Sequence, residues 1–302
     1  MSQNGGGRMA ILGFDVGYKK IRYAVVEDDG CISGEGAFST PDSLRDFYQC
    51  ISDLSGEIVG QYDICGAGFS LPGAVDNKTG FVSGRTAISY LHGFNIRRDL
   101  QNLLLLPVVM ENAANCAALG EAWAGAGMDY QDMVYLSVGH GIGGAMVKNK
   151  QVIAGVHRYG GGFGYAVMNE EGETLDEVAS PFAVAGKLSL KKGLPENAIS
   201  SHQAFEMMEA GDHDAMEAIE SMYGYLAQAI YNVQYTYDPE VFVIGGAVTA
   251  RQDFVENIRR HLERLCRRRR ATSLIPNVVA CDSELDSTLL GLVSNFMMVM
   301  ES

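Results

Sequence analysis

Short apolar runs alternate with amphipathic segments along the chain, and both halves open with strands around a glycine turn. In the first half, residues 9–14 and 23–26 predict strands on either side of Asp15-Val-Gly17, and Asp29-Gly30 predicts a hairpin turn. In the second half, residues 133–138 and 145–147 predict strands that flank the glycine-rich run 139–144. The two halves therefore repeat one theme.

Helical periodicity follows each pair of strands. Pro41, with Asp42 or Ser43 as N-cap, predicts the start of the first helix. This first helix covers 43–60. The further predicted helices cover 113–126, 202–237, 253–270 and 288–300, and the further predicted strands cover 64–69, 107–110, 241–244 and 277–280. Mixed helices and strands predict two α/β domains. We expect a flexible leader at 1–8, a smaller domain at 9–118 completed by a C-terminal helix at 287–302, and a larger domain at 119–286.

Composition and charge narrow the classes of partner. A chain of 302 residues with 47% hydrophobic and 20% charged residues has the balance of a globular protein with two cores. The net charge of −14 disfavours phosphate backbones and anionic lipid, so we expect no nucleic-acid or membrane partner. The dense basic run Arg267–Arg270 is interpreted as the solvated end of a helix rather than as a nucleic-acid patch.

The six cysteines are scattered and form no CxC or CxxC pair. This usage is typical of reduced thiols, and we expect a cytoplasmic protein without a cysteine-based metal site.

Three strand-to-turn junctions carry candidate chemistry: Asp15-Val-Gly17, Gly139–Gly144 and Gly245-Gly246. Glycine lets backbone N–H groups approach phosphate oxygens, because no Cβ intervenes. The run Gly139–Gly144 lacks the GK[ST] of a Walker A loop and is followed by a strand. Taken alone, each of these turns is explained equally well as an ordinary hairpin turn or as a phosphate-binding loop. Three together predict one nucleotide site gripped from two domains.

Six segments in order resemble the ROK family of repressors, open reading frames and sugar kinases. They are Phe14–Gly17, Ser70–Asp76, Glu111–Glu121, Gly139–Gly144, Gly160–Tyr165 and Val243–Gly246, and residues 87–94 resemble the zinc-free hexose and β-glucoside kinase branch. The resemblance implies the α/β actin-like, ribonuclease-H-like ATPase fold, with two α/β domains around a central cleft. It also implies ATP and Mg²⁺ as cofactors, a small-molecule sugar as substrate and a homodimer.

The resemblance also implies residue roles. Sugar binding falls on Ser70, Gly73, Asn112, Gly162 and Tyr165. ATP and phosphate binding falls on Asp15, Gly17, Lys19, Gly139, His140, Gly141, Gly143, Gly245 and Gly246, with Asp15 also helping to hold Mg²⁺. Residues 165–180 contain no cysteine or histidine, so the family's zinc motif is absent and no zinc is expected.

This sequence departs from the family pattern in several loops. The position of the catalytic base holds Ala113, which cannot accept a proton. Gly162 replaces the glutamate expected to accept bonds from sugar hydroxyls, and Tyr165 replaces a histidine. In the phosphate loops, Tyr18-Lys19 stands for Gly-Thr and His140 stands for threonine.

Two hypotheses remain open at this point. The first is an ATP-dependent kinase of a hexose or glycoside hydroxyl, with activity weakened or lost at Ala113. The second is a non-catalytic pseudokinase that senses a sugar or nucleotide, or acts as a scaffold.

Overall fold

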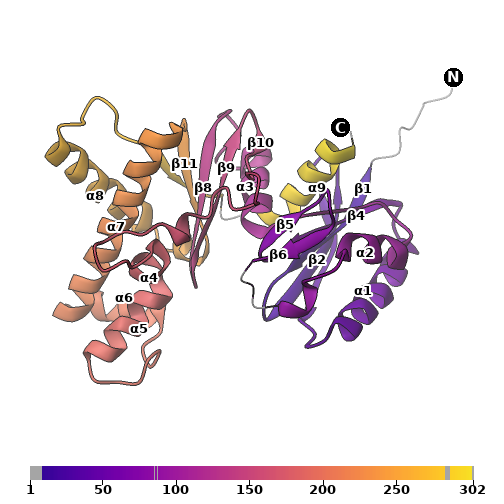
Figure 1. The fold of residues 1–302 in the computed structure, drawn as a ribbon, viewed down its shortest axis with the longest axis horizontal. Coiled ribbons are helices and arrows are strands. Elements are labelled where there is room, and N and C mark those ends of the chain that lie inside the picture. The colour runs from indigo at the N-terminus through magenta and orange to yellow at the C-terminus, as the bar shows by residue number, and fades with distance from the viewer. Residues whose placement is uncertain (1–8, 85, 87, 283–285, 301–302) are drawn as a thin grey trace. The chain divides into compact units, whose positions relative to one another are not determined.

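The computed structural model describes residues 9–84, 86, 88–282 and 286–300, which divide into two compact units (Figure 1). The first unit holds residues 9–125, 154–159 and 286–300, and the second holds 126–153 and 160–282. This division keeps the helix that follows Asn112 whole, whereas the boundary expected between residues 118 and 119 runs through it. The predicted leader at 1–8 lies outside the described residues.

A five-stranded sheet in the order β3-β2-β1-β4-β7 forms the centre of the first unit. Its strands are β1 (Ala10–Val16), β2 (Lys20–Glu27), β3 (Ile32–Ser39), β4 (Ile64–Leu71) and β7 (Val108–Asn112). The first three are antiparallel and joined by hairpins, while β1, β4 and β7 run parallel. A small ribbon of β5 (Ala74–Asp76) and β6 (Phe81–Ser83) was not predicted.

Three helices of the first unit begin at polar side-chain caps, which are Ser43, Asn95 and Asn112. Ser43, one of the two predicted N-caps, caps α1 by accepting a hydrogen bond from the Asp46 N–H. The helices are α1 (Leu44–Val59), the short 3₁₀ helix η1 (Ser89–Leu91), α2 (Ile96–Leu104), α3 (Ala113–Ala124) and α9 (Ser287–Met300). Of these, η1 and α2 were not predicted.

Helix α9 packs on the first unit, as its apolar face predicts. Leu289, Leu292 and Phe296 are buried against β1, β4 and β7, and α9 also lies along α3. Two glycines permit this close approach: a Cβ at Gly291 would lie 1.7 Å from the Cys116 carbonyl oxygen, and one at Gly120 would lie 1.9 Å from the Ser287 carbonyl oxygen. The pair α3–α9 therefore fixes the helix that Asn112 caps.

The second unit has its own five-stranded sheet, in the order β10-β9-β8-β11-β12. Its strands are β8 (Met133–Val138), β9 (Ile142–Lys148), β10 (Gln151–Val152), β11 (Val241–Gly245) and β12 (Val278–Ala280). The strand predicted at 145–147 begins three residues earlier, because Gly143 and Gly144 pair with Ser137 and Leu136 in the β8–β9 ladder. Part of the predicted glycine loop is therefore strand.

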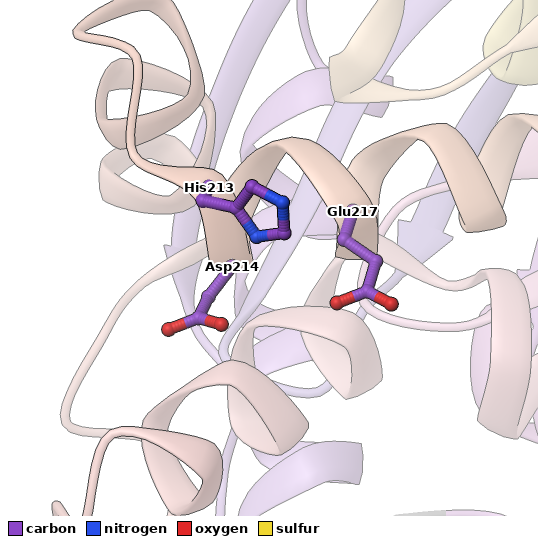
Figure 2. Close-up of side chains that lie close together, drawn as sticks. All are labelled: His213, Asp214 and Glu217. Atoms are coloured by element: carbon purple, nitrogen blue, oxygen red, sulfur yellow. The ribbon is translucent and has the colours of Figure 1, made fainter.

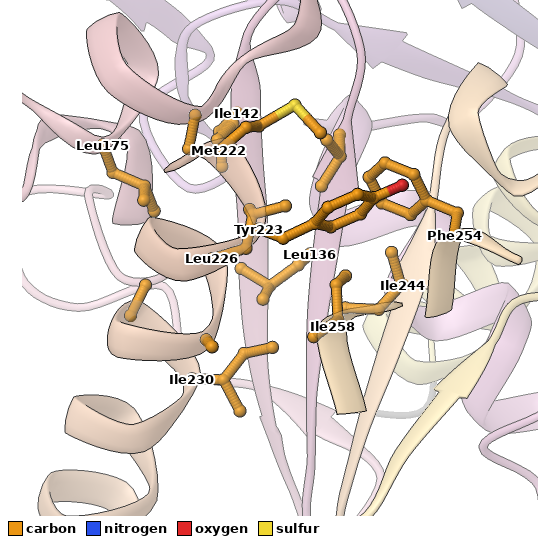
Figure 3. Close-up of a cluster of buried hydrophobic side chains, with 14 of the residues drawn as sticks. Leu136, Ile142, Leu175, Met222, Tyr223, Leu226, Ile230, Ile244, Phe254 and Ile258 are labelled. Atoms are coloured by element: carbon orange, nitrogen blue, oxygen red, sulfur yellow. The ribbon is translucent and has the colours of Figure 1, made fainter. Parts of the chain in front are cut away.

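Helices cover this second sheet, and their apolar faces form its core with Leu136 and Ile244 of the strands (Figure 3). They are the short 3₁₀ helices η2 (Phe163–Tyr165) and η3 (Ala247–Ala250), with α4 (Leu175–Ala179), α5 (Pro181–Lys191), α6 (Ser201–Glu209), α7 (His213–Tyr237) and α8 (Phe254–Arg269). The single helical pattern predicted over 202–237 is two helices, because Gly211 adopts a φ of +85° and Asp212 caps α7. The run Arg267–Arg270 ends α8, as predicted.

Candidate functional site

Three side chains line up across the carboxyl ends of β1, β4 and β7. Strand register places Asp15 beside Ser70, and Ser70 beside Glu111. The Ser70 hydroxyl donates a hydrogen bond of 2.9 Å to Asp15 Oδ1. Because the carboxyl ends of parallel strands meet at one edge of a sheet, these polar groups form one row there, which is where α/β folds bind ligands.

Asn112 joins this row to the first turn of α3. Its side chain caps the helix by accepting the Ala114 N–H at 2.9 Å, and its Nδ2 donates to the Gly73 carbonyl oxygen at 2.7 Å. Gly73 has a φ of +100°, a conformation that favours glycine. Ala113 is the first residue of α3, immediately after this clamp. The structure therefore brings three predicted positions, Gly73, Asn112 and Ala113, together.

Glu111 is held within its own loop. Its Oε1 accepts the Asn112 N–H at 2.7 Å and the Asn115 side-chain amide at 2.8 Å. Burial raises the pKa of Glu111, although these two hydrogen bonds act to lower it. The carboxyl thus anchors the turn between β7 and α3, and the sequence did not single it out as a site residue.

An ion pair between Asp76 and Arg158 was also missed from the sequence. Arg158 donates to Asp76 Oδ1 at 2.9 Å, and Asp76 accepts further hydrogen bonds from the Thr79 hydroxyl and the Lys78 N–H. Burial acts to raise the pKa of Asp76, but these donors outweigh it and the pKa is lowered. The pair joins residues 82 positions apart, so no local pattern could have revealed it.

The β1–β2 hairpin turn carries Gly17, Tyr18 and Lys19. The Gly17 N–H donates to the Lys20 carbonyl oxygen at 3.1 Å, and the Gly17 carbonyl oxygen accepts the Thr40 hydroxyl at 2.6 Å. The Tyr18 side chain is 68% exposed and Lys19 is exposed as well. Both side chains are therefore accessible to solvent, and Lys19 places a positive charge beside the turn.

In the second unit, the glycine run forms the β8–β9 hairpin turn. The Gly139 N–H donates to the Gly141 carbonyl oxygen at 3.0 Å, and the Ile142 N–H donates to the Asp176 carboxylate. Among the described residues, the N–H groups of His140 and Gly141 have no protein acceptor. Two adjacent free donors in a tight turn form a concave site suited to an anion.

The neighbours of this turn explain why some glycines are needed. A Cβ at Gly141 would lie 2.8 Å from Asp176, and one at Gly246 would lie 2.3 Å from the Val138 carbonyl oxygen. A Cβ at Gly139 would meet nothing within 4 Å. Packing therefore explains Gly141 and Gly246, while Gly139 faces open space that a ligand can approach.

The segment from Gly160 to Tyr165 packs on β9, which begins directly after the same turn. A Cβ at Gly164 would lie 2.2 Å from the Ile142 carbonyl oxygen, and Gly161 has a φ of +84°. Gly162 has a φ of −71°, and the Tyr165 side chain is 61% exposed. The His140 ring lies 3.9 Å from that of Phe182.

The predicted site residues therefore fall into two clusters, one in each unit. The first unit holds Asp15, Gly17, Lys19, Ser70, Gly73, Asn112 and Ala113. The second holds Gly139, His140, Gly141, Gly143, Gly162, Tyr165, Gly245 and Gly246. In the second cluster, Gly245 pairs with Ser137 at the end of β8, next to the glycine turn.

Magnesium has one candidate protein ligand in the first cluster. Arg22 donates to Asp15 Oδ2 through Nη2 at 2.7 Å and through Nε at 3.2 Å, whereas Oδ1 accepts, from the described part of the chain, only the Ser70 hydroxyl. Oδ1 therefore keeps a lone pair. This fits Mg²⁺ bound mainly by nucleotide phosphates and water, since such sites commonly use only one or two carboxylates.

His213, Asp214 and Glu217 form another cluster of possible metal ligands on the first turns of α7 (Figure 2). Lys191 lies 3.0 Å from Asp214 and 2.7 Å from Glu217, and Lys192 lies 3.2 Å from Asp214. The carboxylates already pair with these ammonium groups, so the cluster is explained as a surface ion-pair network.

Known proteins resemble this chain over most of its length. Residues 11–297 match the ROK family. A β-glucoside kinase from Listeria monocytogenes is 30% identical over 261 residues, covering 84% of this chain and 88% of that protein.

Solved structures agree with this match. A ROK family protein from Streptococcus pneumoniae, in complex with sucrose, is 30% identical with a TM-score of 0.88, covering 97% of this chain and 99% of that one. A ROK family glucokinase from Streptomyces griseus, in complex with glucose and AMPPNP, is 21% identical with a TM-score of 0.76 and covers 95% and 98%. The fold is that of the ROK sugar kinases, the actin-like ATPase fold. Within the described residues, no helix has the length and apolar character needed to cross a bilayer.

Proposed function

This chain belongs to the ROK family, and we propose that it binds ATP and a sugar as a kinase of a hexose or glycoside hydroxyl whose catalysis is weakened or lost. Support for the sugar comes from the kinase relatives and from the sucrose and glucose bound in two neighbours. The AMPPNP bound in the glucokinase supports the nucleotide.

The observation that carries the proposal is the clamp between Asn112 and Gly73. A side-chain amide that caps a helix and also holds the loop at Gly73 is expected to fix the edge of the first unit where the sugar would bind. This scaffold is intact, yet the residue directly after it is Ala113. Ala113 therefore removes the catalytic base while the residues proposed to bind the sugar stay in place.

Each cluster has a defined part in phosphoryl transfer. In the first unit, Ser70, Gly73 and Asn112 bind and orient the sugar, and Lys19 offers charge to the phosphates. In the second, the free N–H groups of His140 and Gly141 donate hydrogen bonds to phosphate oxygens. Mg²⁺ held near Asp15 would neutralise phosphate charge when bound.

Loss of the base has a predictable cost. A positioned general base typically contributes about 10²–10⁴ in rate, or roughly 3–5 kcal/mol of barrier. Glu111 cannot replace it as placed, because its Oε1 is held by Asn112 and Asn115. Gly162 further removes a carboxylate acceptor that the family pattern assigns to the sugar hydroxyls.

The same departures favour a second function, a pseudokinase that senses a sugar or nucleotide or acts as a scaffold. Ala113 and Gly162 each stand where the family pattern has a carboxylate, and Tyr18 adds a side chain where that pattern has glycine, while the backbone of both clusters stays in place. We further propose a cytoplasmic homodimer without zinc.

A coupled assay of sugar-dependent ADP release, run over hexoses and β-glucosides, tests the enzyme. Calorimetry with the same sugars and with Mg-ATP tests binding separately. Turnover supports the weak kinase, whereas binding without turnover supports the pseudokinase. Absence of both binding and turnover across the panel would contradict the proposed function.

A further inference from the structure

A pocket of about 420 Å³ lies between α7 and α8, within the second unit. It is lined by Gly224, Gln228, His261, Arg264, Leu265 and Arg268. Its volume falls within the range of about 300–1,000 Å³ typical of small-molecule sites. None of these residues belongs to the two clusters described above, so the pocket is a separate feature of the molecule.

The charge of this pocket is opposite to that of the chain. Seven of the 23 Lys and Arg residues lie on α8 and the residue after it, although the chain carries a net −14. At the pocket, Arg264 and Arg268 contribute two guanidinium groups. Glu220, on the preceding turn of α7, is the acidic group that pairs with this side of α8.

Glu220 does not neutralise both arginines. Its Oε1 accepts from Arg260 at 2.8 Å and its Oε2 lies 3.0 Å from His261 Nε2, whereas Arg264 is 4.0 Å away. Among the described residues, Arg268 has no ion pair or hydrogen-bond partner for its side chain. Two donors are thus left for an anion, and a guanidinium group presents a planar fork that matches phosphate oxygens.

The rest of the lining is polar and open. Gln228 donates its Nε2 to the Met168 carbonyl oxygen at 3.2 Å, which leaves its Oε1 to accept a hydrogen bond from a ligand. A Cβ at Gly224 would meet nothing within 4 Å, and Leu265 is the one large apolar side chain in the lining. A hydrogen-bond acceptor beside open space suits a ligand with hydroxyl groups better than an aromatic ligand.

We propose that this pocket binds a phosphate monoester of a small hydroxylated molecule. Such an ester carries nearly two negative charges at neutral pH, which two arginines match, whereas a carboxylate carries one. The pocket volume also leaves room for the organic part of such an ester, which inorganic phosphate does not have. This site is independent of the proposed kinase function.

Calorimetry at about 0.15 M salt, where the Debye length is about 8 Å, tests the proposal with glucose 6-phosphate as the probe. Inorganic phosphate and gluconate are the comparison ligands. We expect glucose 6-phosphate to bind at least tenfold more tightly than either. Equal affinity for inorganic phosphate would overturn the assignment to a monoester, and equal affinity for gluconate would overturn the need for a dianion.

Variants distinguish this pocket from any other site for the probe. The double change Arg264→Ala and Arg268→Ala is expected to weaken binding at least tenfold, and Glu220→Gln is expected to strengthen it by removing a competing carboxylate. The matched control is Arg269→Ala, one residue along α8 and outside the lining, with an expected change below twofold. Unchanged affinity in the double variant, or an equal loss in the control, would overturn the proposal.

Discussion

Arg22 on β2 donates two hydrogen bonds to Asp15 Oδ2, the residue opposite it in the β1–β2 ladder. The other side of the guanidinium group pairs with Asp286. Burial acts to lower the pKa of Arg22, but the two carboxylates outweigh it and raise that pKa. Arg22 is therefore a fixed cation that holds Asp15 in place at the end of β1.

Replacing Arg22 by Met should destabilise the first unit, because Asp15 and Asp286 would face each other without a shared cation. We expect a loss of about 1–3 kcal/mol in the free energy of unfolding, measured by urea denaturation. Lys20→Met, an exposed position on the same strand, is the control and should change stability by less than about 0.5 kcal/mol. Equal effects of the two changes would show that the pair contributes nothing.

The raised pKa of Glu111 predicts a pH dependence of stability. A carboxyl that binds its proton more tightly when folded stabilises the protein below its ordinary pKa of 4.5, and that stability is lost as the pH rises through the folded value. Glu111→Gln keeps an oxygen to accept from Asn112 and Asn115. The free energy of unfolding of the variant should therefore fall less steeply as the pH rises, by up to about 1.4 kcal/mol per pH unit within that window.

Asp76→Asn provides a control of opposite sign. The pKa of Asp76 is lowered, so its contribution is present at neutral pH and is lost as the pH falls through the folded value. Denaturation curves from pH 3 to pH 8 should separate the two variants. If Glu111→Gln follows the same pH profile as the unaltered chain, burial does not govern the Glu111 carboxyl.

Gly246 is predicted to be intolerant of any side chain. Its φ of +98° and the 2.3 Å approach of a Cβ to the Val138 carbonyl oxygen should make Gly246→Ala cost about 2 kcal/mol or more. Gly56→Ala, in α1 with nothing within 4 Å, should instead stabilise by about 0.5–1 kcal/mol. Thermal denaturation compares the two, and similar small shifts would contradict the assigned packing.

The proposed homodimer gives a direct prediction of mass. Two chains of 32.6 kDa sum to about 65 kDa, which light scattering at micromolar concentration should report. A single species of 32.6 kDa would contradict it.

Local signals in the sequence were sufficient for much of the fold. The Ser43 cap, the turn at Gly30 and the apolar face of α9 each depend on a few neighbouring residues, and each is confirmed. The break between α6 and α7 was missed although Gly211 and Asp212 mark it, because the apolar period continues across the gap.

Candidate site residues could be named from the sequence only where a motif is contiguous. Asn112 and Gly73 were identified through the family resemblance, and the structure joins them by a hydrogen bond. Arg158 and Asp176 were not identified, because each reaches its partner through tertiary packing: Asp176 accepts the Ile142 N–H from 34 residues away. Contacts of this kind leave no local periodicity.

Carboxylates can be introduced at Ala113 and Gly162 without backbone strain. Ala113→Asp places a negative charge at the first residue of α3, where the helix dipole favours it. Gly162 has a φ of −71°, which any L-residue can adopt, so Gly162→Glu is also compatible with the backbone. Both variants should therefore fold.

The most direct test of the account is the rate of sugar-dependent ADP release by the unaltered chain, by Ala113→Asp and by the double variant Ala113→Asp/Gly162→Glu. We predict a rate near background for the unaltered chain, and a rise for Ala113→Asp that falls short of the full ~10²–10⁴ of a positioned base. The double variant should exceed either single change, because both act on one bound sugar. Vigorous turnover by the unaltered chain, in the usual range of about 1–10³ s⁻¹, would contradict the claim that Ala113 costs this kinase its chemistry.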